Sequence, residues 1–200
     1  MVNVTNTHQL FPTIVHEFIY EADENLKSSI KNQDITRYKK FHTCSSNNKN
    51  LHLEPEFEGF VNKVMSTTKE IIEVYQWSHD KLEITNMWVN ISQKGDTHMP
   101  HNHSNNIFSG VWYPFENKTT PIFFYDPKHI AHFWSPQKTK ANHHNSNIWS
   151  VHNKQNLGLI FPSWLHHSVP PADDIRISVS WNVLVRGKYG EPNTLQNASI

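Results

Sequence analysis

The stretch Met99-Pro-His-Asn-His-Ser-Asn-Asn-Ile-Phe-Ser-Gly-Val-Trp-Tyr113 decides the fold, because two histidines one residue apart lead into an apolar run typical of a strand. A second stretch, Phe161-Pro-Ser-Trp-Leu-His-His-Ser-Val169, carries two more histidines, and Arg176-Ile-Ser-Val-Ser-Trp-Asn182 follows it. Imidazole is the commonest protein ligand for first-row metals, and a guanidinium suits a carboxylate. Together the three segments predict a divalent metal beside a pocket for a small carboxylate.

Composition indicates one aromatic-rich domain without a charge bias. The chain has 200 residues, 12% of them aromatic, with 18 basic and 18 acidic side chains. Such a length suits a single domain, and the balanced charge gives no basic surface, so we expect no nucleic acid as partner. Cys44 is the single cysteine, which excludes a disulfide framework and suits a reducing cytoplasm. The sequence shows neither a signal-peptide pattern nor an apolar stretch long enough for a membrane, so we expect a cytoplasmic protein.

The fold class follows from a change of periodicity along the chain. Residues 1–80 are expected to form an arm and a helical part, 81–186 a β core, and 187–200 a tail, all in one domain, 1–200. In the β core we count six or seven short strands joined by turn-rich connections. This pattern favours a mainly β protein, an antiparallel sandwich or jelly roll, with the N-terminal helices packed on its outer sheet.

Individual elements are read from their apolar spacing. Leu10–Ile19 is typical of a short strand or an extended arm, and Glu21–Gln33 has helical composition. Phe41–Leu53 is polar and rich in Asn and Ser, which predicts a loop. From Glu54-Pro55 to about Trp77, apolar residues recur three and four apart, which predicts a long amphipathic helix. The expected strands are Leu82–Ser92, Ile107–Tyr113, Pro121–Asp126, Ile148–Val151, Leu157–Phe161 and Ile175–Val185.

The metal ligands are predicted from strand geometry. Residues i and i+2 of a strand point to the same face, so His101 and His103 could both reach one ion. Of the adjacent pair further on, His167 shares a face with the apolar Leu165 and Val169, and we select it as the third ligand. Zinc held by three imidazoles is an alternative to a redox metal. With 15 histidines in the chain, such pairs also arise by chance, so a metal-free scaffold is the other alternative.

From about residue 82 to 184 the sequence resembles the iron(II)- and 2-oxoglutarate-dependent oxygenases, and more narrowly the small oxygenases of this kind common in bacterial and phage genomes. The resemblance implies a cupin-like double-stranded β-helix with Fe(II) at its open end and 2-oxoglutarate as co-substrate. It also implies hydroxylation of a substrate with release of succinate and CO₂. The segments that carry it are Leu10-Phe-Pro-Thr, Trp88-Val-Asn-Ile, Pro100-His-Asn-His103, Ser109-Gly-Val-Trp-Tyr113, Asp126-Pro127, Phe161-Pro-Ser-Trp-Leu165 with His167, and Arg176 through Asn182.

One position departs from the wider superfamily, whose first strand carries His-x-Asp/Glu. His103 stands where the carboxylate is expected, so three imidazoles leave the site more positive by one charge. Asp96 or Asp126 could supply a carboxylate, although neither has the motif spacing. One of His101 and His103 could instead support a ligand without touching the metal.

The resemblance also implies a pocket for the distal carboxylate of 2-oxoglutarate. Arg176 would bind it, with Ser178 beside it on the same face of the strand and Tyr113 on the opposite wall. Asn90 and Asn182 are predicted to add polar lining.

Each of these residues has a structural alternative. Arg176 could form an ion pair with Asp173 or Asp174 nearby. Simple core packing is the alternative for Tyr113, and it is the interpretation we favour for the tryptophans Trp88, Trp112 and Trp164.

Two other functions remain open, a cupin-like three-His metal enzyme that does not use 2-oxoglutarate and a non-catalytic jelly-roll binding protein. The substrate, a small molecule or a protein, is not specified by the sequence. An edge strand near Phe11 could pair with another copy of the chain, which leaves a homodimer open. The 127–147 loop is expected to be polar, with its histidines facing solvent: His129, His132, His143 and His144.

Overall fold

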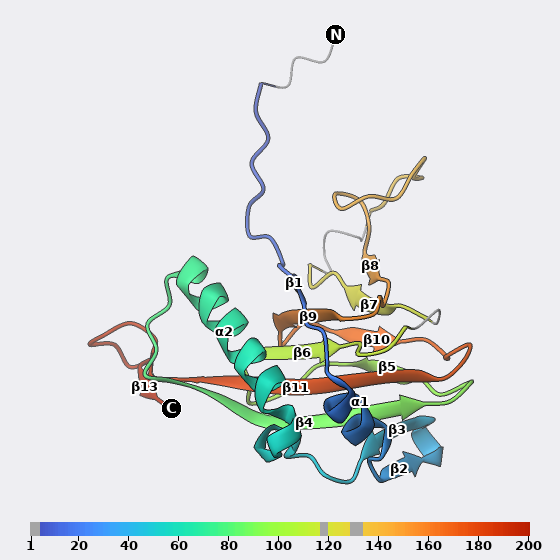
Figure 1. Ribbon diagram of the computed structural model, residues 1–200. Coiled ribbons are helices and arrows are strands. Elements are labelled where there is room, and N and C mark those ends of the chain that lie inside the picture. Colours follow the sequence, from blue (N-terminus) through green and yellow to red (C-terminus); the bar gives the residue numbers. More distant parts are fainter. Residues whose placement is uncertain (1–4, 117–119, 129–133) are drawn as a thin grey trace.

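Two antiparallel sheets form the body of the molecule in the computed structural model, which describes residues 5–116, 120–128 and 134–200 (Figure 1). The five-stranded sheet has the order β1-β9-β6-β11-β4, and the four-stranded sheet the order β5-β10-β7-β8. The first sheet is built from β1 (His16–Ile19), β4 (Lys81–Ser92), β6 (Phe108–Trp112), β9 (Leu157–Pro162) and β11 (Arg176–Arg186). The second is built from β5 (His98–His101), β7 (Ile122–Tyr125), β8 (Ile148–Val151) and β10 (His167–Val169). This is the predicted mainly β jelly roll.

The long predicted helix is α2 (Glu58–Tyr75), preceded by a 3₁₀ turn at Pro55–Phe57, where proline suits a first turn. Figure 1 shows α2 lying across the five-stranded sheet. Phe60 on α2 stacks on Trp112 with ring centroids 4.4 Å apart and meets the edge of Trp181 at 5.3 Å. The Trp181 ring also lies so close to Gly110 that a Cβ there would come within 2.1 Å of it. Only glycine therefore fits at this point of β6.

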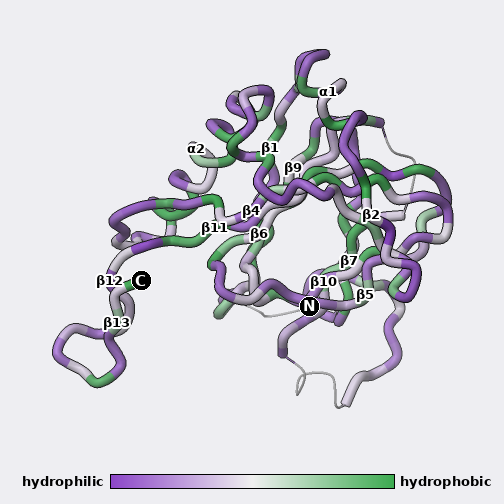
Figure 2. Tube along the Cα trace, turned by 90° about the horizontal axis from the view of Figure 1, so that it is seen from below, coloured by the Kyte–Doolittle hydropathy of each residue, from purple (hydrophilic) through white to green (hydrophobic). Residues whose placement is uncertain are grey.

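A second apolar cluster lies between the two sheets. Alternation along β6 sends Trp112 outward to α2, while Val111 and Tyr113 point inward. Figure 2, seen from below, shows the sheets as opposite walls, with β6 and β9 on one side and β5, β7 and β10 on the other. The inner cluster comprises Val111, Tyr113, Ile122, Phe124, Leu157, Leu159, Phe161, Leu165 and Val169. It fills one part of the interior and leaves a polar part beside it.

The predicted loop at Phe41–Leu53 is wrong in its first half. Here the chain forms a hairpin of β2 (Ile35–Tyr38) and β3 (Thr43–Ser46), with a 3₁₀ turn at Lys39–Phe41 between the strands. A second 3₁₀ turn follows at Leu51–Leu53. The hairpin is tied to the turn after β4 by Arg37, which donates to Asp96 at 2.5 Å and to the Ile91 carbonyl at 2.9 Å.

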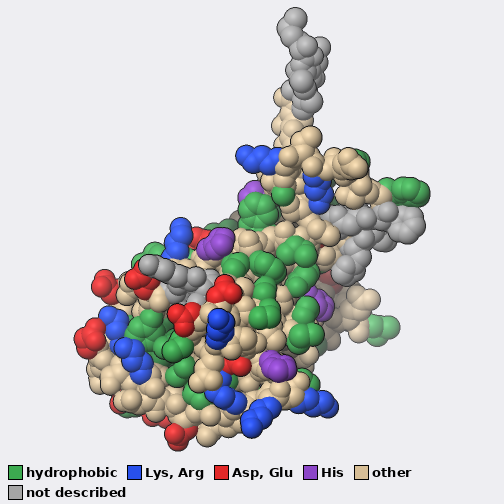
Figure 3. Space-filling model, turned by 90° about the vertical axis from the view of Figure 1, so that its right-hand side faces the viewer, with side chains coloured by type: hydrophobic (Ala, Val, Ile, Leu, Met, Phe, Trp, Pro, Cys, Tyr) green, Lys and Arg blue, Asp and Glu red, His purple; other side chains and the backbone are tan. Residues whose placement is uncertain are grey.

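The remaining elements are short. α1 (Glu24–Lys31) is capped by Asp23, which accepts from the Leu26 N–H at 2.8 Å. The predicted tail contains a two-residue pairing of β12 (Lys188–Tyr189) with β13 (Ala198–Ser199). In the described residues no helix has the length and apolarity needed to cross a bilayer. On the face shown in Figure 3, Lys and Arg side chains are interspersed with Asp and Glu.

Candidate metal centre

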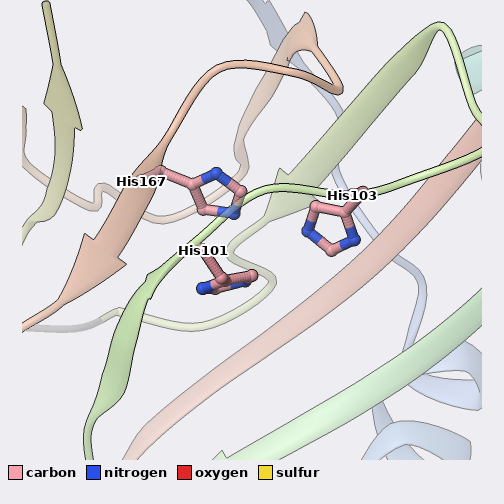
Figure 4. A group of neighbouring side chains, drawn as sticks. All are labelled: His101, His103 and His167. Carbon is pink, nitrogen blue, oxygen red and sulfur yellow. The ribbon is translucent and has the colours of Figure 1, made fainter.

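Three histidines, two from the four-stranded sheet and one just beyond it, meet inside the molecule (Figure 4). His101 ends β5, His167 begins β10, and the pairing of these strands places the two residues opposite each other. His103 lies just beyond β5, held by its backbone N–H, which donates to the Ser163 carbonyl at 2.9 Å. One ring nitrogen of each histidine lies within 4.8 Å of the others. The three predicted ligands are therefore brought together, close enough to share one ion.

Backbone carbonyls orient two of the three rings. His101 Nδ1 lies 2.7 Å from the Met99 carbonyl, and His167 Nδ1 lies 2.9 Å from the Leu165 carbonyl. Because a carbonyl can only accept, Nδ1 must carry the proton in both rings. Nε2 then presents its lone pair, which is the form that coordinates a metal.

The rings of His103 and His167 are electrically neutral at physiological pH. Burial, reinforced by the neighbouring His101, lowers the pKa of His103 to about 4 and that of His167 to about 3. A metal ion would therefore displace no proton from these two side chains near pH 7.

No carboxylate joins this group within the described residues. The Asp96 carboxylate is instead held by Arg37, 2.5 Å away. Asp126 accepts from the Lys128 N–H at 2.9 Å and is likewise not in the group. The donor set is thus three imidazoles.

Arg176 lies in the same cavity as the three histidines. It is only 2% exposed, and its guanidinium donates to Tyr113 Oη at 3.0 Å and to Ser178 Oγ at 3.3 Å. Its Nε has no acceptor. The ion pair with Asp173 or Asp174 does not form, and no carboxylate of the described chain pairs with Arg176. A buried cation with an unused donor is what an anionic ligand would complete.

Asn90 also lines the cavity, but Asn182 does not. The Asn90 amide donates to Ser180 Oγ at 3.2 Å, and its Oδ1 has no donor. Asn182 accepts from Ser109 Oγ at 2.6 Å and donates to Asn86 Oδ1 at 2.7 Å. The prediction that Asn182 lines the pocket is therefore wrong, because its amide belongs to a buried hydrogen-bond network further along β11.

The tryptophans behave in three different ways. Trp112 is fully buried in the core, as predicted. Trp88 instead lines the cavity, with its ring centroid 6.0 Å from that of His103. Trp164 is 52% exposed on the turn between β9 and β10. Core packing is thus the wrong interpretation for two of the three.

Sequence reasoning missed His98, which lines the cavity between Arg176 and the histidine cluster. Burial, together with the charges of Arg176 and His101, lowers its pKa to about 4. Residues three apart on a regular strand point to opposite faces, so the spacing of His98 and His101 gave no signal. An irregularity in the pairing of β5 with β10, between His167 and Val169, allows both side chains to reach the interior.

The histidines of the 127–147 loop are not part of the site in the described residues. His143 and His144 are exposed, as predicted, and the His143 ring packs 3.8 Å from that of Trp149. His129 and His132 lie outside the described residues.

Comparison with solved structures supports the fold. A prolyl-4-hydroxylase from Pseudomonas putida is 10% identical, with a TM-score of 0.63 over 88% of this chain and 94% of that one. HygX from Streptomyces hygroscopicus, crystallised with nickel, 2-oxoglutarate and hygromycin B bound, is 10% identical, with a TM-score of 0.60 over 86% and 83%. A 2OG-Fe(II) oxygenase family oxidoreductase from Burkholderia pseudomallei is 9% identical, with a TM-score of 0.59 over 85% and 84%. At such identities the likeness establishes the jelly-roll fold alone.

Sequence comparison adds the family. No curated protein matches the chain significantly. Residues 86–182 match the family model described as "Putative 2OG-Fe(II) oxygenase". This range contains the three clustered histidines and Arg176. Over residues 86–182, just under half of its length, the chain is therefore similar to the 2OG-Fe(II) oxygenases.

Proposed function

We propose that the protein is an Fe(II)- and 2-oxoglutarate-dependent oxygenase that hydroxylates a substrate, with succinate and CO₂ as co-products. One observation carries the proposal. Arg176, buried and without a carboxylate partner in the described chain, shares a cavity with three clustered histidines. A cationic group and a metal-ligand set in one cavity suit a ligand with a carboxylate at one end and metal-binding oxygens at the other.

His101, His103 and His167 would hold the metal. Imidazole nitrogens suit Fe(II), and the two carbonyl-bound rings already present the required lone pairs. When bound, iron and 2-oxoglutarate together supply the oxidative chemistry, and the protein binds and orients the reactants. With no carboxylate in the donor set, the centre would carry one more positive charge than a 2-His-1-carboxylate site. This charge favours the anionic co-substrate.

Arg176 would bind the distal carboxylate of 2-oxoglutarate through Nε and the Nη hydrogens that Tyr113 and Ser178 do not use. Tyr113 and Ser178 fix the guanidinium plane through their hydrogen bonds, so the side chain is oriented before the ligand arrives. Phe161, which packs 4.8 Å from the His167 ring, lines the cavity with other apolar side chains. These apolar walls keep water away from the ligand, which strengthens its interaction with Arg176.

Hydroxylation and a cytoplasmic location are the finer parts of the proposal. The prolyl-4-hydroxylase from Pseudomonas putida has a similar fold, but so does SnoN, an epimerase from nogalamycin biosynthesis, with a TM-score of 0.56. The fold therefore accommodates more than one reaction, and the substrate decides which occurs. A reducing cytoplasm suits both Fe(II) and the buried free thiol of Cys44.

A three-His metal enzyme that does not use 2-oxoglutarate is the second candidate. The absence of a carboxylate from the described ligand group favours it. The unpaired Arg176 argues against it, since such an enzyme has no need of a buried anion-binding residue.

Anaerobic titration of the Fe(II)-loaded protein with 2-oxoglutarate tests the proposal. Chelation of Fe(II) by the keto acid gives a weak visible charge-transfer band. We expect the band in the wild type and its loss in His167→Ala and in Arg176→Ala. His166→Ala is the matched control, because this neighbouring side chain is exposed and should leave the band unchanged.

The outcomes separate the candidates. Iron binding without a band, followed by no succinate on admission of O₂ and candidate substrates, would favour the three-His enzyme. A wild-type protein that binds no Fe(II) would exclude both metal enzymes and favour the jelly-roll binding protein.

A further inference from the structure

Among the described residues that line the cavity, His98 is the one titratable side chain that belongs neither to the metal group nor to the co-substrate residues. It lies on β5, in the four-stranded sheet, whereas Arg176 lies on β11, in the five-stranded sheet. Both side chains line the same cavity, and the charge of Arg176 is felt at the His98 ring. The two residues thus approach one space from opposite walls.

The His98 ring has no firm hydrogen bond of its own. Thr43 Oγ1, on β3, lies 3.4 Å from both ring nitrogens, which is long for either. The hydroxyl therefore touches the ring edge and leaves the nitrogens available. In either tautomer of the neutral ring, one nitrogen is an N–H donor that can turn toward an anion.

A carboxylate beside Arg176 would need such a donor. Nη1 and Nη2 each donate one of their two N–H groups, to Ser178 and Tyr113, and Nε has no acceptor, so at most three N–H groups of Arg176 are left for a ligand. A carboxylate has about four lone-pair sites on its two oxygens, so Arg176 alone would leave at least one of them unpaired in a buried place. Asn90 cannot fill this role as it stands, because its amide N–H groups face Ser178 and Ser180.

We propose that His98 is a second co-substrate-binding residue, donating from β5 to the carboxylate that Arg176 binds from β11. The inference rests on the proposed function, since it assigns a residue to the same pocket. The β2–β3 hairpin supports this residue through Thr43, whose hydroxyl lies against the His98 ring. This hairpin lies outside residues 86–182, which match the family model, so the support of His98 comes from another part of the chain.

The test measures which end of the ligand His98 recognises. Binding of 2-oxoglutarate and of 2-oxobutanoate, which lacks the distal carboxylate, is measured by calorimetry on anaerobic Mn(II)-loaded protein. His98→Phe keeps a ring but loses the donor, and His98→Gln keeps a donor. His152→Phe, at an exposed histidine between β8 and β9, is the matched control.

We expect His98→Phe to lower the affinity for 2-oxoglutarate by about tenfold or more, which corresponds to the loss of one hydrogen bond to a charged group. The affinity for 2-oxobutanoate and for Mn(II) should stay within about twofold, and His98→Gln and His152→Phe should keep most of the 2-oxoglutarate affinity. Unchanged Mn(II) affinity shows that the variant folds and keeps its metal group. If His98→Phe does not fold, His98→Ala replaces it, and its affinities for 2-oxoglutarate and 2-oxobutanoate are compared in the same way.

Two results would overturn the inference while leaving the proposed function intact. One is a wild type that binds 2-oxoglutarate and a His98→Phe variant that binds it equally well. The other is an equal loss of affinity for both keto acids, or a loss of affinity for Mn(II), because either would show that His98 acts on the metal site. A wild type that binds neither keto acid would refute the proposed function and, with it, the role of His98.

Discussion

Replacing Arg176 with methionine separates a ligand-binding cation from a structural one. The guanidinium is 2% exposed and donates to two neutral hydroxyls, those of Tyr113 and Ser178. Burying a charge without a counter-ion costs several kcal/mol, and hydrogen bonds from a charged donor return about 1.5–3 kcal/mol each. The opposing contributions are similar, and methionine fills much of the space. We therefore expect the free energy of unfolding of the ligand-free protein to change by less than about 1.5 kcal/mol.

The wild type and Arg176→Met should differ in how much 2-oxoglutarate stabilises them. At about one hundred times its Kd, 2-oxoglutarate stabilises a protein that binds it only when folded by about 2.7 kcal/mol. The wild type should gain this amount and Arg176→Met almost none. Urea unfolding of Mn(II)-loaded protein, with and without 2-oxoglutarate, measures both values. Arg186→Met serves as control, because Arg186 is 41% exposed on the same strand and pairs with Glu83 at the surface.

A different ligand-free result would refute the reasoning. Removing one partner of a buried ion pair costs about 3–5 kcal/mol. If Arg176→Met loses that much stability without ligand, the guanidinium belongs to a paired structural network and the argument for an anion site fails.

Three other substitutions test the fold and the site boundary. Asn182→Ala should lower the free energy of unfolding in urea by about 1–3 kcal/mol, because it removes the hydrogen bonds to Ser109 and Asn86 from a buried network, yet 2-oxoglutarate affinity by calorimetry should not change. Phe60→Ala should lower the free energy of unfolding by about 3–5 kcal/mol. Val74→Ala, at a side chain of α2 that is 74% exposed, should lower it by less than about 0.5 kcal/mol. Burial raises the pKa of the Cys44 thiol, so iodoacetamide at pH 8 should label it far more slowly in native than in urea-unfolded protein; equal rates would contradict its burial.

Periodicity predicted the elements whose side chains alternate between core and solvent. Helix α2 and strands β4, β6 and β11 were found close to the expected residues, since each buries one regular face. The β2–β3 hairpin was missed because Cys44-Ser-Ser-Asn-Asn48 has no apolar alternation. Its stability comes instead from partners distant in sequence, such as Ser46 Oγ, which accepts from the Val89 N–H at 3.1 Å.

The candidate site was predictable to the extent that it follows regular strand geometry or the family resemblance. His101, His103, His167 and Arg176 meet in one cavity. His98 lay beyond reach because a local irregularity in strand pairing, invisible in sequence, turns it inward. The prediction that Asn182 lines the pocket was wrong for a similar reason. Its position on β11 was predicted correctly, but the hydrogen-bond network that occupies its amide depends on tertiary contacts.

The position of β11 has a consequence for how the chain is made. This strand pairs with β4 on one side and β6 on the other, yet it follows both in the chain, and residues 176–186 meet residues 81–92 across most of the core. During synthesis, which starts at the N-terminus, the five-stranded sheet therefore lacks β11, one of its inner strands, until residue 186 has left the ribosome. Pairings so distant in sequence form slowly, because loop closure precedes the contacts that stabilise it. Until then the apolar faces of β4 and β6 remain open to other chains, so the yield of native protein should depend on chaperones and on the rate of synthesis.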